Sequence, residues 1–130
     1  MLSLPSNVRL FLADNPVDFR KSFDGLSGIV EGEFGMSVRG GDVFVFLNRR
    51  GNQVKLLFWE RDGLCLVIKR LEAGTFRRIR REGSTTPQIE IDAAELVLLL
   101  EGIEVQALRR RKRYVDDENV LAERNKQVYS

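Results

Sequence analysis

Histidine is absent from this chain of 130 residues, and cysteine occurs once, as Cys65. Without histidine the sequence lacks the commonest general base and the commonest transition-metal ligand, and with a single cysteine a zinc site is close to excluded. A lone cysteine forms no internal disulfide, which is typical of proteins in a reducing cytosol. We interpret Cys65, inside an apolar run, as a small buried hydrophobic residue. We therefore expect no metal, no cofactor and a cytoplasmic location.

Long apolar runs are also missing. No segment approaches the roughly 20 residues that a membrane span needs, and the first residues lack the pattern of a signal peptide. Hydrophobic residues make up 43% of the chain, enough for one core. We expect a single domain over residues 1–108. Residues 109–130 begin with five consecutive basic residues, and we expect a charged, flexible tail there.

The net charge of +2 conceals a strong asymmetry along the chain. Residues 49–81 hold ten basic and three acidic residues, a local balance of +7, whereas residues 82–104 hold six acidic residues and no lysine or arginine. A basic surface beside an acidic element suggests one face for a polyanion and another face for a different contact. The alternative is that the two segments neutralise each other in the fold.

Residues 42–81 contain three apolar runs separated by two turn signals. They predict strands at 43–47, 53–60 and 64–70, joined by tight hairpins. Val43, Val45 and Leu47 should face one side and Phe44 and Phe46 the other, so both faces of the sheet should be covered.

Three further segments have the character of strands. We expect a first strand at 8–13, a short basic edge strand at 76–81 and a brief strand at 89–91. The charges of residues 76–81 have a second interpretation, which is that they guard a sheet edge against aggregation.

A helix is predicted over Asp18–Glu31, where apolar residues recur at helical spacing. Arg20 and Lys21 would then lie in its first turn, where the helix dipole disfavours cations unless an anion binds, so they suggest a phosphate seat. The alternative is an Arg20–Asp24 pair four residues apart.

A second, short helix is predicted over residues 93–101. Asp92 and Glu95 have the spacing of a capping box, and Gly102 is a natural stop. Because this helix is apolar almost all round, it should be buried on the sheet or, alternatively, in an interface. The predicted fold class is therefore α+β: a mostly antiparallel, meandering sheet of about four or five strands, with one N-terminal helix and one short buried C-terminal helix.

A family resemblance rests on three stretches of the sequence. They are Asp18-Phe19-Arg20-Lys21 with Asp24-Gly25-Leu26; Val45-Phe46 with Asn48-Arg49-Arg50-Gly51, Lys55 to Trp59, Asp62-Gly63, Lys69 to Glu72 and Gly74 to Phe76; and Leu96 to Gly102. In order and spacing they resemble the TnpB, or Orf two-like, accessory proteins of the sixty-six family of bacterial insertion sequences, over about residues 8–105. The resemblance implies a role in transposition of a mobile element, beside a separate and larger transposase that supplies the strand-transfer chemistry.

Three functional hypotheses follow, of which we favour a non-catalytic protein that binds DNA through its phosphates. The candidate phosphate contacts are Arg20, Lys21, Arg49, Arg50, Lys69, Arg70, Arg77, Arg78, Arg80 and Arg81. Trp59 is a candidate for stacking on a base, with a core position as the alternative. The second hypothesis is an adaptor that docks on the transposase, through the apolar helix or an open sheet face, without direct DNA binding.

The third and least favoured hypothesis is an enzyme with a carboxylate magnesium site at Asp18, Asp24, Glu60 and Asp62. Their places at helix starts and tight turns have an ordinary structural explanation. The expected partners are DNA and, from the resemblance, the transposase of the same element; a homo-oligomer is left open, and no membrane association is expected.

Overall fold

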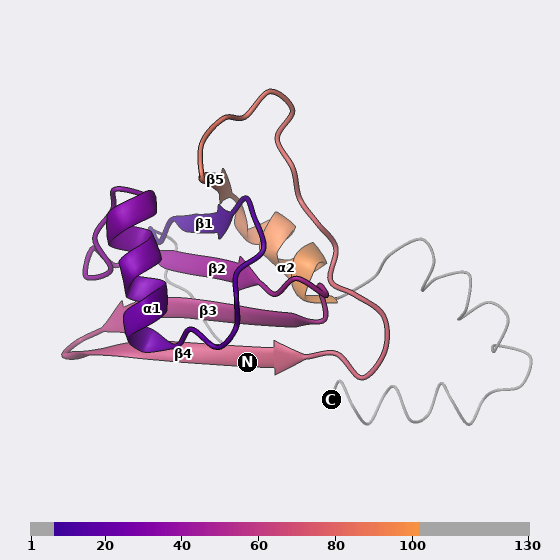
Figure 1. Ribbon diagram of the computed structural model, residues 1–130. Helices are drawn as coiled ribbons and strands as arrows, with labels where there is room; N and C mark the ends of the chain where they lie inside the picture. The colour runs from indigo at the N-terminus through magenta and orange to yellow at the C-terminus, as the bar shows by residue number, and fades with distance from the viewer. Residues whose placement is uncertain (1–6, 102–130) are drawn as a thin grey trace, which may run out of the picture.

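A computed structural model describes residues 7–101, which form one five-stranded sheet with a helix on each face (Figure 1). The strand order is β4-β3-β2-β1-β5, and the predicted α+β class is confirmed. The strands are β1 (Leu10–Ala13), β2 (Val43–Leu47), β3 (Gln53–Glu60), β4 (Gly63–Arg70) and β5 (Gln88–Ile91). The helices are α1 (Phe23–Gly28), continued by the π-helical turn η1 (Ile29–Glu33), and α2 (Ala93–Glu101).

Strands β2, β3 and β4 are an antiparallel meander, as their turn signals predict. The β3–β4 turn is tight, since Glu60 pairs with Gly63. The other end of the sheet is built differently, because β1 pairs parallel to β2 and antiparallel to β5. The sheet is thus mixed, with one parallel pair in an otherwise antiparallel arrangement.

The alternation of β2 divides the core into two layers. Val43, Val45 and Leu47 belong to the cluster under α2, and Phe44 and Phe46 belong to the cluster under α1. All five side chains are buried. The expectation that both faces of the sheet are covered is therefore confirmed, and α1 and α2 lie on opposite faces in Figure 1.

Helix α2 packs on the sheet through Leu96 and Leu99, as predicted. The capping box also forms: the Glu95 amide donates to Asp92 Oδ1 at 2.7 Å, and the Asp92 amide donates to Glu95 Oε1 at 3.0 Å. The outer face of the helix is not covered by any described residue, since Val97 is 50% and Leu98 44% exposed. The predicted stop at Gly102 lies outside the described residues.

Helix α1 begins at Phe23, five residues later than predicted. The carbonyls of Phe19 and Lys21, which a longer helix would use, accept hydrogen bonds from Lys55 Nζ at 3.0 and 2.8 Å. Asp18 meanwhile binds the amide and side chain of Arg20. A contact distant in sequence thus overrides the local helical pattern, and Arg20 and Lys21 lie before the helix rather than in its first turn.

Residues 76–81 are not a strand, so that prediction is wrong. Phe76 is only 1% exposed in the core under α2, and its amide donates to the Gly51 carbonyl at 2.7 Å. These two contacts hold the segment across the end of the sheet instead of along its edge. The two edges are β4 and β5. The predicted tail at 109–130, with the last part of the predicted domain, lies outside the described residues.

Candidate nucleic-acid interface

The loop between β2 and β3 carries Arg49 and Arg50 at one end of the sheet. Asn48, only 8% exposed, braces this loop, because its Nδ2 donates to Asn52 Oδ1 at 2.8 Å and its Oδ1 accepts from the Gln53 amide at 3.0 Å. Gly51 has a φ of +75°, a conformation that glycine adopts without strain. The two arginines are therefore exposed on a loop of defined conformation.

The chain that leaves β4 returns to this same loop. The Leu71 amide donates to the Asn52 carbonyl at 2.9 Å, directly after Arg70, and the Phe76 amide donates to the Gly51 carbonyl, directly before Arg77. A Cβ on Gly51 would lie 3.6 Å from Thr75 Cβ, so the loop and the returning segment are in contact. These contacts bring three separate basic segments to one end of the sheet.

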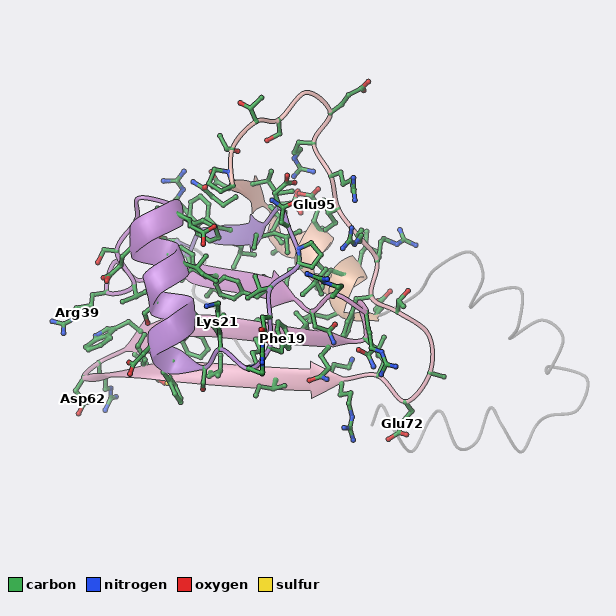
Figure 2. The ribbon with its side chains drawn as sticks, viewed as in Figure 1. Phe19, Lys21, Arg39, Asp62, Glu72 and Glu95 are labelled. Carbon is green, nitrogen blue, oxygen red and sulfur yellow. The ribbon has the colours of Figure 1, made fainter. Side chains whose placement is uncertain are left out.

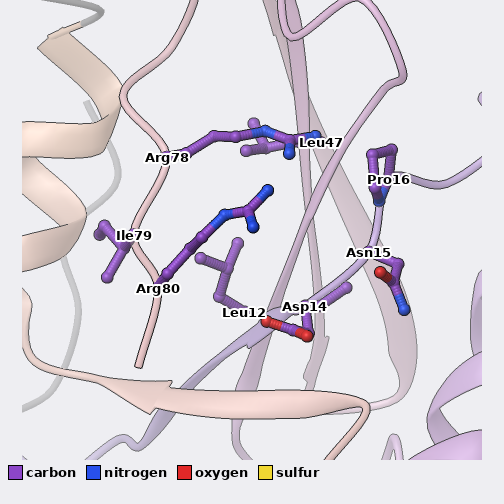
Figure 3. Close-up of a pocket in the computed structure, with 9 residues that line it drawn as sticks. Leu12, Asp14, Asn15, Pro16, Leu47, Arg78, Ile79 and Arg80 are labelled. Atoms are coloured by element: carbon purple, nitrogen blue, oxygen red, sulfur yellow. The ribbon is translucent and has the colours of Figure 1, made fainter. Parts of the chain in front are cut away.

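Beyond Phe76 the chain crosses the ends of β1 and β2. Arg78 and Arg80 line a shallow hollow there with Leu47 and Asp14, and they extend in the same direction across it (Figure 3). The hollow has a cavity volume of only about 10 Å³, room for a single water. Pockets for small molecules are far larger, at roughly 300–1,000 Å³. This region therefore offers a charged surface rather than a small-molecule site.

We define the basic end as six arginines on the β2–β3 loop and on residues 70–80. They are Arg49, Arg50, Arg70, Arg77, Arg78 and Arg80. Glu72 is the single acidic residue in these two segments, which gives a local balance of +5. Five of the six, all except Arg77, have no side-chain hydrogen bond or ion pair within residues 7–101. No side chain of the described residues competes with an external anion for these five guanidinium groups.

Three of the other candidate cations are already used by the fold. Arg20 is bidentate on Asp18, with Nη2 to Oδ2 at 2.6 Å, and this contact lowers the pKa of the carboxyl from 3.8 to about 2. Lys69 Nζ donates to the Leu100 carbonyl at the end of α2, at 2.9 Å. Arg81 donates to Glu95 Oε1 at 2.7 Å and to the Glu90 carbonyl at 3.0 Å.

The sequence left two interpretations open for the start of the first helix and two for the charge asymmetry, and these contacts bear on both. Arg20 pairs with Asp18 and not with Asp24, and a phosphate seat in a first helical turn is ruled out because α1 starts later. The neutralisation of basic by acidic segments holds for Arg81 and Glu95. Within the described part of the chain it does not extend to Arg49, Arg50, Arg70, Arg78 or Arg80.

Trp59 lies at the other end of β3 from the arginine loop. Six residues separate it from Gln53, or about 20 Å of strand. The ring is half-buried, its Nε1 donates to the Arg61 carbonyl at 3.0 Å, and the Arg39 guanidinium stacks 4.8 Å from its centroid. Figure 2 shows Arg39 and Asp62 at this end and Glu72 at the opposite end. The structure thus separates Trp59 from the basic end.

Lys55 is the residue whose importance the sequence did not reveal. It is 6% exposed, lies under the segment that precedes α1, and its Nζ is 4.6 Å from the centre of the Phe19 ring. Burial lowers the pKa of Lys55 from its ordinary value. A lysine in the otherwise apolar run of residues 54–59 was the available signal, because charged residues are almost never buried without partners.

Among residues 7–101, no group of three or more histidine, cysteine, aspartate or glutamate side chains could hold a metal ion. Cys65 is half-buried rather than buried, and burial raises the pKa of its thiol. None of the described helices is long and apolar enough to cross a membrane.

Comparison with known proteins identifies relatives over most of the chain. Residues 8–110 match the model of the IS66 Orf2-like protein family. Protein y4hO of Sinorhizobium fredii (strain NBRC 101917 / NGR234) is 35% identical over 104 residues, which cover 80% of this chain and 88% of the relative. Protein y4jC of the same strain is 33% identical over 76 residues, 58% of this chain and 65% of the relative. Both are described as uncharacterized, and no solved structure matches.

Proposed function

The chain belongs to the IS66 Orf2-like family, whose role is in insertion-sequence transposition, and on that premise we propose that it is a non-catalytic accessory protein that binds DNA through the basic end of its sheet. The proposal places it in the bacterial cytoplasm, on the DNA of the element. It leaves strand transfer to the transposase, which we take to be its protein partner. We also treat residues 1–108 as the functional domain and residues 109–130 as a charged tail.

The observation that carries the proposal is the convergence, from three segments, of arginines that have no side-chain partner within residues 7–101. Arg49 and Arg50, Arg70, and Arg78 and Arg80 are far apart in sequence, and backbone contacts at Gly51 and Asn52 bring them to one end of the sheet. Like charges held together repel one another, and binding a polyanion relieves that repulsion. Arginine suits this role because its planar fork binds phosphate through two hydrogen bonds.

The geometry favours contacts to phosphates over contacts to bases. The arginines lie on a short loop and on an extended segment across the strand ends, and α1 and α2 are both packed on the sheet. Contacts from such surfaces fix a protein on the duplex and carry little sequence information. We therefore expect binding that depends strongly on salt and weakly on sequence.

Fluorescence anisotropy on a duplex with the terminal repeats of the element, and on a scrambled duplex, tests the proposal. The variant R49Q/R50Q removes two cations from the basic end. Its control, R9Q/R39Q, removes two cations from the other end of the sheet, so both variants have the same net charge. The wild type should lose affinity as salt rises, with about 0.9 log unit of binding constant per log unit of salt for each phosphate contacted.

R49Q/R50Q should reduce that slope by about 1.8, and R9Q/R39Q should leave it nearly unchanged. If the two variants lose affinity equally, binding follows net charge alone and the basic end is not the site. Absence of binding at low salt by a folded protein would refute direct DNA contact.

An adaptor role is the second candidate, and the outer face of α2 favours it. Val97 and Leu98 are two of the five large hydrophobic residues that are exposed among residues 7–101. Exposed apolar side chains on one helix are typical of protein-binding surfaces. In this case V97K/L98K should abolish capture of the purified transposase while R49Q/R50Q leaves it intact; the reverse pattern would exclude the α2 face.

A further inference from the structure

The two edge strands of the sheet differ in how they are protected. β5 has four residues, and its central Glu90 is held by both Arg9 Nε and Arg9 Nη2, at 3.0 and 2.7 Å. β4 has eight residues, and its middle, Leu64 to Ile68, contains no charge, proline or glycine. Natural sheet edges are usually kept short or guarded by charges, since a long apolar edge is a template for another strand.

β4 also has exposed apolar side chains, which a second strand paired at this edge would partly cover. Val67 is 39% and Ile68 54% exposed, and they face opposite sides of the sheet, opposite Leu56 and Lys55 of β3. No described element lies beyond β4 (Figure 1). Within residues 7–101, therefore, no strand pairs with β4 on the side away from β3.

Charge at the two ends of β4 indicates what would pair with it. Asp62 immediately precedes the strand, and Lys69 and Arg70 end it. An antiparallel copy of the same strand would set the acidic end of one chain against the basic end of the other, twice. Opposite charges across paired strands stabilise a sheet, whereas like charges destabilise it.

We propose that β4 pairs antiparallel with β4 of a second copy of this chain, around a twofold axis centred on Leu66. The five strands of each copy then form one continuous sheet. This inference does not depend on DNA binding: Arg70 is the single residue that it shares with the basic end, and disulfide trapping at Leu66 tests the pairing without changing any arginine.

The register follows from symmetry and side-chain chemistry. Rotation about a twofold axis normal to the sheet leaves each face of the sheet on the same side. Residues paired across the axis must therefore point to the same face. Because side chains alternate along the strand, the axis has to pass between a residue and its own copy. With the axis at Leu66, Leu64 meets the partner's Ile68, Cys65 meets the partner's Val67 and Arg70 meets the partner's Asp62. Moving the axis to Val67 would instead set Cys65 against the partner's Lys69.

Disulfide trapping tests both the dimer and its register, with the full chain in a C65S background. In C65S/L66C the two thiols face each other across the axis, with Cα atoms about 4.5–5.5 Å apart, within disulfide range. In C65S/I68C the two thiols are four residues apart along the sheet, about 14 Å, and out of range. Ile68 is more exposed than Leu66, so random collision would favour the control.

Mild oxidation at low micromolar concentration should convert C65S/L66C to a covalent dimer and leave C65S/I68C monomeric. Trapping of C65S/I68C as fast as C65S/L66C, or trapping of neither, would overturn the proposal. Circular dichroism confirms that both variants are folded before oxidation.

A charge exchange gives a second test that leaves the apolar strand unchanged. R70D sets like charges against the partner's Asp62 and should raise the dimer dissociation constant about tenfold, measured by sedimentation. D62R/R70D restores opposite charges and should return the constant to near the wild-type value. A monomeric wild type at all concentrations, or an exchange variant as weak as R70D, would refute the pairing.

Discussion

Two regions of this molecule carry positive charge and use it in opposite ways. Under the segment before α1, Lys55 is buried and its Nζ is bound to two backbone carbonyls, of Phe19 and Lys21. At the basic end, Arg49 and Arg50 are exposed and have no side-chain partner within residues 7–101. A count of charges along the sequence treats these residues alike.

The difference between the two regions lies in the backbone that surrounds each cation. Lys55 faces two carbonyls that accept no helical hydrogen bond, so the fold needs its ammonium group. That group is therefore not available to a ligand. The arginines follow Asn48, whose side chain satisfies the loop from within. The loop therefore holds its shape without them. Stability and binding should consequently separate when cations from the two regions are replaced.

The largest effect should come from K55M. It removes two charge-assisted hydrogen bonds that hold the segment before α1 on β3, which should lower the free energy of unfolding by about 2–3 kcal/mol. Urea unfolding followed by circular dichroism measures the change. K21M is the control, since its side chain is exposed and its expected change is within about 0.5 kcal/mol. Equal stability of the two variants would contradict the role given to Lys55.

The next effect should separate two arginine sites that are neighbours in sequence. R78Q/R80Q should reduce the salt dependence of DNA binding by about 1.8 log units per log unit of salt and leave the unfolding midpoint unchanged. R81Q should lower the unfolding midpoint, because it removes the contacts to Glu95 and to the Glu90 carbonyl, and it should leave the salt dependence unchanged. Anisotropy and urea unfolding are both measured on each variant. An equal effect of both changes on DNA binding would remove the distinction.

The contrast between these regions also shows what the sequence could predict. The strands β2, β3 and β4 follow from apolar runs and tight turns, and the capping box at Asp92 and Glu95 follows from spacing, because these signals are local. The start of α1 and the path of residues 76–81 could not be predicted in this way. They depend on Lys55 and on the contact between Phe76 and Gly51, across 34 or more residues in one case and 25 in the other.

The candidate site was predictable in composition and not in arrangement. All six arginines of the basic end were named from the charge run, but so were Lys69 and Arg81, which the fold already uses. Arg20 was named from its expected place in a first helical turn, and the fold pairs it with Asp18. Their separation depends on which carboxylates and carbonyls come near each cation in three dimensions. Trp59 was placed beside basic residues by sequence proximity alone, and the strand carries it to the other end of the sheet.

A third effect should be found at Lys69, the other lysine that binds backbone. K69M removes the hydrogen bond to the Leu100 carbonyl and a positive charge near the C-terminal end of the α2 dipole, which should cost about 1 kcal/mol. The loss should be greatest in the exchange protection of the α2 amides, measured by hydrogen–deuterium exchange. Arg70 provides the control, because R70Q alters the adjacent exposed position and should leave α2 protection as in the wild type. Weakened DNA binding in K69M with unchanged α2 protection would move Lys69 into the binding group.

The smallest effect concerns Asp18 and Arg20. This pair lies in the segment before α1, near Lys55, but it is exposed like the arginines of the basic end. The Arg20 guanidinium and amide lower the pKa of Asp18 to about 2, from 3.8. The folded state thus binds a proton less readily than the unfolded chain, so the pair contributes stability above pH 3.8 and loses it as the pH falls through about 2. The stability difference between wild type and D18N should therefore shrink over that interval.

In R20Q the pKa of Asp18, followed by carboxyl carbon chemical shift, should return toward 3.8. In R39Q, which changes a distant exposed arginine, the pKa of Asp18 should stay near 2. An Asp18 that titrates near 3.8 while Arg20 is present would mean that this exposed pair is open in solution, and that Lys55 alone holds the segment before α1.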